Sequence, residues 1–114
     1  MKIEVEDATG AVLDWLVAKC EGVVLEHGLT DDERYSTNPA QGHPIIERER
    51  ISVRTCASPG HQWVAFLDFG GSYVSGIKAR MTGPTALIAA MRCYVTCKLG
   101  HVVDVPDELC NKEV

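Results

Sequence analysis

The thiols are the most reactive side chains of this sequence. The five cysteines are Cys20, Cys56, Cys93, Cys97 and Cys110. Cys93 and Cys97 stand four residues apart in a stretch that favours a helix, so both side chains would face the same side. Two thiolates at this spacing can share a metal ion, but a tetrahedral site needs two further ligands, and no second pair at metal-binding spacing accompanies them. An odd set of cysteines without a secretory leader also argues against a disulfide framework. We therefore expect reduced thiols that pack as small apolar side chains, and no metal or other cofactor.

A second group of polar residues could form a site for a ligand or a partner. Glu47 and Glu49 flank Arg48, and paired carboxylates can serve as general acid and base. Their side chains share a face in a strand and diverge in a helix, so their geometry depends on the local fold. The candidate binding residues are Tyr35, Gln41, Glu47, Arg48, Glu49 and Arg92. No catalytic residue stands out among them, and the sequence leaves open whether the protein is an enzyme.

Arg92 is the only charged residue within the otherwise apolar or small stretch 85–97. Two interpretations are open. The side chain can extend along the helix until its guanidinium reaches water, or it can be partly buried against a carboxylate. The acids that follow the isoleucine pair at 45–46 stand in a similarly apolar context. We therefore test the hypothesis that Arg92 is partly buried and held by Glu47 or Glu49.

Composition and charge restrict the classes of protein. The chain has 114 residues, of which 46% are hydrophobic and 24% are charged, and this fits one globular domain over residues 1–114. Lys and Arg total 11 against 16 Asp and Glu, which gives a net charge of -5. Nucleic-acid binding is disfavoured, because such proteins usually carry a basic surface. The longest apolar run, 86–91, is far shorter than the roughly 20 residues of a membrane span, and the first residues lack a secretory signal. We expect a cytoplasmic protein that does not enter a membrane.

Hydrophobic periodicity and breaker residues predict the elements that would position these side chains. We expect helices over 8–21 and 83–99, strands over 1–6, 51–55 and 102–105, a β-hairpin formed by 63–69 and 72–80, and helical turns over 44–49 and 106–109. The segment 44–51 also fits a strand. Because the helices do not alternate regularly with strands, the expected fold is α+β, with a small, mainly antiparallel sheet packed against two helices.

Turn-forming residues are dense between positions 27 and 44, and they predict a long irregular loop. Ordered loops of this length in small domains are usually functional. This gives weight to Tyr35 and Gln41 as binding residues. A surface loop without a site is the alternative.

Four blocks of sequence resemble a family of phage and prophage proteins described as NinX-like. They are LDWLVAKCEG at 13–22, YST at 35–37, QGHPIIERE at 41–49 and GPTALIAAMRCY at 83–94. The chain departs from the family pattern at 38–39 and at His43. The resemblance implies a phage accessory protein made in the host cytoplasm. It implies no biochemical activity and supplies no catalytic residue.

Two functions compete on these observations. In the first, a non-enzymatic module binds a host or phage protein through the 27–44 loop and the acidic surface beside it. In the second, a small-molecule-binding protein or an enzyme has a polar pocket between that loop and the start of the helix at 83–99. The acidic charge, the small size and the absence of a catalytic motif favour the first.

Overall fold

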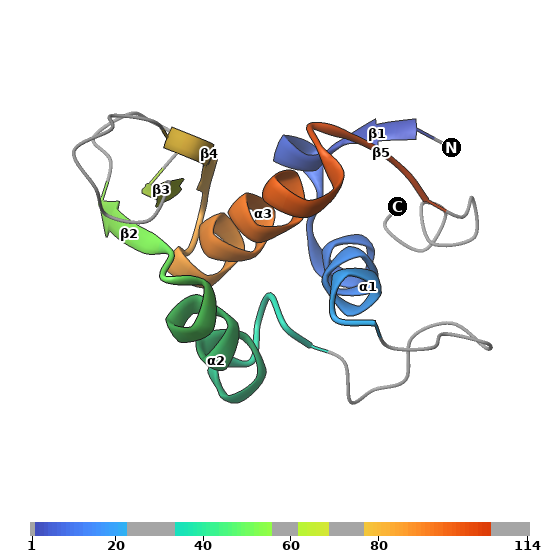
Figure 1. Ribbon diagram of the computed structural model, residues 1–114. Coiled ribbons are helices and arrows are strands. Elements are labelled where there is room, and N and C mark those ends of the chain that lie inside the picture. The colour runs from blue at the N-terminus through green and yellow to red at the C-terminus, as the bar shows by residue number, and fades with distance from the viewer. Residues whose placement is uncertain (1, 23–33, 56–61, 69–76, 106–114) are drawn as a thin grey trace.

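The computed structural model describes residues 2–22, 34–55, 62–68 and 77–105 (Figure 1). Along the chain these residues form β1 (Lys2–Glu4), the 3-10 helix η1 (Val5–Asp7), α1 (Gly10–Cys20), α2 (Pro39–Glu49), β2 (Ser52–Thr55), β3 (Trp63–Asp68), β4 (Ile77–Gly83), α3 (Ala86–Leu99) and β5 (Val102–Asp104). The α+β class predicted from the sequence is confirmed. The turn predicted at 106–109 lies outside the described residues.

The α3 helix is the centre of the fold and contacts all the other helices and both sheets (Figure 1). It begins after Thr85, whose hydroxyl accepts a hydrogen bond from the N–H of Ile88 at 3.1 Å, and it ends at Gly100, where φ is 93°. Eight consecutive residues, from Ala89 to Thr96, are buried. Burial all round a helix requires neighbours on every side. The helix predicted over 83–99 is confirmed, but it starts at Ala86 because Gly83 still belongs to β4.

The strands form two separate antiparallel sheets. The larger sheet has the order β2-β3-β4, and the smaller one pairs β1 with β5. The sequence predicts a single small sheet, so the antiparallel pairing is confirmed but the number of sheets differs. The reason is the length of α3, whose 14 residues span about 20 Å. Because β4 precedes α3 and β5 follows it, the two strands lie at opposite ends of this helix (Figure 1).

The α2 helix occupies part of the segment predicted as a loop. It begins at Pro39, and the Asn38 side chain caps it by accepting a hydrogen bond from the N–H of Ala40 at 3.0 Å. The loop prediction is therefore wrong for 39–44, and residues 27–33 lie outside the described part of the chain. The helical turn over 44–49 and the following strand are confirmed as the end of α2 and as β2. Pro44 lies inside the helix rather than at its start. Asparagine is favoured at the N-cap and proline at the first position of a helix, so the pair at 38–39 is typical of a helix start.

The core surrounds α3 and includes an apolar stripe of α1. Its members include Leu13, Leu16, Val17, Ala65, Leu67, Met81, Met91, Tyr94 and Val95. Trp15 and Cys20 on α1 are partly buried against the same core. The α1 helix begins after Thr9 and is followed by Gly22 with φ 78°, close to the predicted bounds of 8–21.

The buried thiols should react slowly in the native protein. Cys93 is fully buried and donates a weak hydrogen bond to the carbonyl of Ala79. Burial raises the pKa of Cys93 to about 12 and that of Cys20 to about 11, so neither is a thiolate at neutral pH. We expect a thiol reagent to label Cys93 only after denaturant is added, with Cys97, which is half-buried, also slow. Mass spectrometry of the labelled peptides assigns each rate, and fast native labelling of Cys93 would contradict the packing.

Candidate functional site

A polar network joins the three helices around Arg48. The guanidinium of Arg48, in the last turn of α2, donates two hydrogen bonds to the carboxylate of Glu21, at 3.0 and 2.7 Å. Its Nε also donates to Glu49 at 2.8 Å. Glu21 follows the last residue of α1. The bidentate contact therefore connects the end of α2 to the end of α1.

Tyr94 extends this network to α3. Its ring is buried in the core, with 2% exposed, while its hydroxyl donates to Glu21 and accepts a hydrogen bond from Arg48 at 3.2 Å. Lys98, one turn further along α3, lies 3.8 Å from the carboxylate of Glu49. Both cations also lie over the ring of Tyr94, at 5.8 Å for Arg48 and 5.9 Å for Lys98. Three helices thus meet at one cluster of charges on an aromatic ring.

The titration behaviour of this network does not suit acid–base catalysis. The hydrogen bonds from Arg48 lower the pKa of Glu21, and the same contact raises the pKa of Arg48. Burial raises the pKa of Tyr94, and its hydrogen bond to Glu21 adds to the effect. A catalytic acid or base works best with a pKa near the working pH. Each of these three shifts leads away from neutrality, so the network keeps fixed charges that connect the helices.

Acid should weaken the network in a predictable way. Because the pKa of Glu21 is lower in the folded protein than its ordinary value of 4.5, its contribution to stability is present above pH 4.5 and is lost as the pH falls through the folded value. At neutral pH we expect Glu21→Gln to lower the free energy of unfolding by about 1 kcal/mol, since Arg48 is half exposed. In urea denaturation, the difference in the free energy of unfolding between the wild type and the variant should become smaller below about pH 4.5.

The matched control is Glu47→Gln, which removes a carboxylate on the exposed side of α2. The side chain of Glu47 is 72% exposed, and an exposed ion pair contributes little to stability. This variant should unfold like the wild type at every pH. If Glu21→Gln lowered the free energy of unfolding by the same amount at every pH, the ionic role of Glu21 would be contradicted.

The structure separates the other residues predicted for the site. Arg48 and Glu49 lie together in the network. Glu47 lies on the solvent side of α2, with His43 Nδ1 at 3.7 Å. The Gln41 side chain accepts a hydrogen bond from the backbone N–H of Arg34 and so supports the turn before the helix. Tyr35 is half-buried against the core.

Arg92 is buried as predicted, with 6% exposed, but the predicted partner is wrong. Its Nε donates to the carbonyl of Ala8 at 2.8 Å, and a terminal nitrogen donates to the carbonyl of Thr82 at 2.9 Å. Neither Glu47 nor Glu49 holds it, because Arg92 and Tyr94 are two residues apart on a helix and so point about 200° apart. Tyr94 faces the network. Arg92 therefore lies on the opposite side of α3 from Arg48, and the two do not share a pocket.

Comparison with known proteins identifies the family. Residues 4–98 match the model of the family described as bacteriophage P22, NinX. The chain belongs to this family. The match runs from the end of β1 almost to the end of α3 and confirms the resemblance noted in the sequence. It places the chain among phage accessory proteins. No curated protein matches the sequence.

Other charged groups of this NinX-family chain gave no signal in the sequence. Glu21 lies 27 residues from Arg48 and 73 from Tyr94, so no local spacing connects them.

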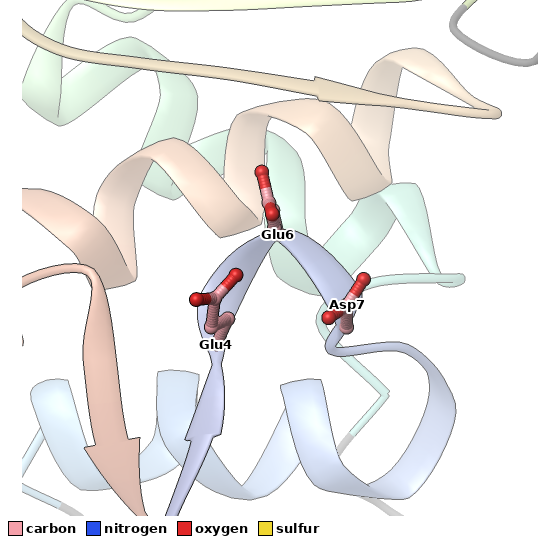
Figure 2. A group of neighbouring side chains, drawn as sticks. All are labelled: Glu4, Glu6 and Asp7. Atoms are coloured by element: carbon pink, nitrogen blue, oxygen red, sulfur yellow. The ribbon is translucent and has the colours of Figure 1, made fainter.

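Three exposed acids, Glu4, Glu6 and Asp7, form a cluster at the start of the chain (Figure 2). One carboxylate oxygen of each lies within 4.8 Å of the others. They gather because the strand predicted over 1–6 ends at Glu4 and the chain turns into η1. A hydrogen bond and charge repulsion from Glu6 raise the pKa of Glu4. The cluster forms an acidic surface at this end of the molecule.

No helix in the described part of the chain is long and apolar enough to cross a membrane.

Proposed function

We propose that this chain is a non-enzymatic protein-binding module that acts in the host cytoplasm. It binds a host or phage protein through the turn and helix at 34–49, which include residues 34–44, the described part of the 27–44 segment singled out in the sequence. Support comes from the two sides of α2. The inner side packs on α3 through the buried residues Gly42 and Ile45. The exposed residues of the helix before Arg48 are Pro39, Ala40, His43, Pro44 and Glu47.

The observation that carries the proposal is that α2 is fixed at both ends before any partner binds. At its start, Asn38 caps the helix and Gln41 holds the preceding turn. At its end, Arg48 is held by Glu21 and lies against Tyr94. An element that is already ordered loses little conformational entropy on association, so more of the contact energy appears as affinity. A fixed helix with a free outer side therefore suits recognition of another protein.

The alternative, a small-molecule site or an enzyme, has less support. A pocket of this kind requires the guanidinium groups of Arg48 and Arg92 to lie together, whereas they lie on opposite sides of α3. Gln41 is engaged by the backbone of Arg34, and Glu47 lies in solvent. The pKa shifts of Glu21 and Tyr94 also lead away from neutrality. These observations favour binding over catalysis.

Site-specific photo-crosslinking in phage-infected cells tests the proposal. A photoreactive amino acid replaces Ala40 or Glu47 on the outer side of α2, and in the control it replaces Lys19, which is exposed on α1. We expect one polypeptide adduct of the same mass from both α2 positions and none from Lys19. Equal adducts at all three positions would contradict the proposal. So would native mass spectrometry that shows a retained metabolite and no polypeptide.

A further inference from the structure

Four exposed residues form one stripe along the outer side of α2. Ala40, His43, Pro44 and Glu47 stand at i, i+3, i+4 and i+7, the spacing that places side chains on a single face of a helix. All four are exposed, whereas the buried residues of α2 lie on the opposite side. We call these four residues the outer stripe. One face of the helix is therefore open to a partner along about two turns.

The proline inside α2 leaves one backbone acceptor of the outer stripe without its usual donor. In a regular helix the carbonyl of Ala40 accepts a hydrogen bond from the N–H of the residue four positions later. That residue is Pro44, which has no N–H and whose ring crowds the same carbonyl. Ala40 and Pro44 are both exposed. The Ala40 carbonyl is therefore available to a donor from another molecule.

Glu47 supplies a negative charge that the neighbouring network does not neutralise. Among the residues that the structure describes, its ion-pair contact is with His43 at 3.7 Å, and His43 is charged only when protonated. The adjacent cation, Arg48, is held by Glu21 and Glu49 instead. A chain of net charge -5 thus presents an exposed carboxylate on the outer stripe that a cation of a partner can reach.

The two acceptors of the outer stripe approach each other along the helix. Helical carbonyl groups point toward the C-terminus, so the Ala40 oxygen lies near the level of Pro44. Helical side chains tilt toward the N-terminus, and the Glu47 carboxylate accordingly reaches His43. Both acceptors therefore lie within about one turn of each other, or about 5 Å along the axis. A guanidinium group is planar and carries five N–H donors, so it can donate to both.

We propose that the outer stripe binds an arginine side chain of the partner protein. The guanidinium donates to the Ala40 carbonyl and pairs with Glu47, while the apolar stem of the arginine packs on the ring of Pro44. This inference rests on the proposed function, because it names the group through which the partner contacts α2. A lysine fits less well, since its ammonium group is a point charge rather than a planar fork. An acidic partner would be repelled by Glu47 and by the net charge of the chain.

Selection from a library of short random peptides tests this inference before the partner is known. The bait is the immobilised full chain, and the selected peptides are then labelled for fluorescence anisotropy. We expect arginine to recur at one position, and its replacement by lysine or citrulline should lower the affinity about tenfold. Glu47→Gln should lower the affinity by a similar factor. Selected peptides without a recurring arginine, or binding that does not depend on Glu47, would overturn the inference.

Pro44→Ala tests the role of the Ala40 carbonyl, because it should change stability and binding in opposite directions. Alanine restores the missing N–H and removes an interior proline, so the melting temperature should rise. The restored hydrogen bond occupies the carbonyl, so the affinity for the selected peptide should fall about tenfold. The matched control is Pro39→Ala, at the first position of the helix, where proline costs no hydrogen bond and the affinity should stay nearly unchanged. If Pro44→Ala bound as tightly as the wild type, the inference would fail.

Crosslinking at α2 separates this inference from the proposed function. Adducts at both α2 positions, together with peptide binding that does not depend on arginine, would support the proposed function and overturn this inference. Arginine-dependent peptide binding without an adduct in infected cells would support the chemistry of the outer stripe and contradict the proposed function. If both are correct, the adduct at Glu47 should be weaker than the one at Ala40, because the photoreactive residue removes the carboxylate.

Discussion

Arg92→Ala is expected to lower the free energy of unfolding by about 4 kcal/mol. The substitution removes the donors that Arg92 supplies to the carbonyls of Ala8 and Thr82. A hydrogen bond from a charged group contributes about 1.5 to 3 kcal/mol, and the truncated side chain also leaves a cavity. Arg92→Lys should recover less than half of the loss, because one ammonium group does not reproduce the planar arrangement of two donors. Urea denaturation at neutral pH measures these differences.

The control for this prediction is Arg80→Ala, the same truncation on an exposed part of β4. It should change the free energy of unfolding by no more than about 0.5 kcal/mol. If Arg92→Ala unfolds at the same urea concentration as the wild type, the guanidinium does not hold the two carbonyls.

The expected size of the effect follows from where Arg92 lies. Ala8 connects η1 to α1 on the side of the smaller sheet, whereas Thr82 belongs to β4 of the larger sheet. The two sheets share no strand pairing. Arg92 reaches both from α3, so one side chain fixes both carbonyls to the central helix. Burial lowers the pKa of Arg92, while Asp7 and Glu6 oppose this by raising it. We therefore expect the arginine to stay charged and to keep both hydrogen bonds at neutral pH.

Gly42→Ala is expected to destabilise the protein by about 3 kcal/mol. Alanine is usually the better helix former, by about 1 kcal/mol. Here a β-carbon would collide with the backbone oxygen of Tyr35 and would lie 2.5 Å from Cδ1 of Leu87. The Leu87 side chain can rotate away, but a backbone carbonyl moves only if the turn or the helix moves. The loss should appear as a lower urea midpoint and a lower melting temperature.

Two further variants isolate the cause of this loss. Adding Leu87→Ala to Gly42→Ala removes the side-chain collision alone, so we expect no more than partial recovery. Ala40→Gly, on the exposed side of α2, should cost no more than about 1 kcal/mol, in the direction that helix propensity predicts. If Gly42→Ala proved as stable as the wild type, α2 would lie further from α3 than the structure places it.

Local patterns in the sequence determined most of the elements. The approximate bounds of α1 and α3, the β3–β4 hairpin and the strand at 102–104 all follow from periodicity and caps. These signals are local, because a helix or a strand repeats over a few residues and its ends are marked by particular residue types. The start of α2 at Pro39, with Asn38 as its cap, is also marked locally, but the density of turn residues around it favours a loop.

For the candidate site, the sequence identified individual residues but not their partners. It singled out Arg48 and Arg92 and predicted the burial of Arg92, whereas only the tertiary structure showed that they lie on opposite sides of α3. Arg48 meets Glu21 because the ends of α1 and α2 come together on α3. Arg92 is held by backbone carbonyls, and every residue carries one, so no residue type marks them. Which carbonyls it reaches depends on how η1 and β4 pack around the central helix.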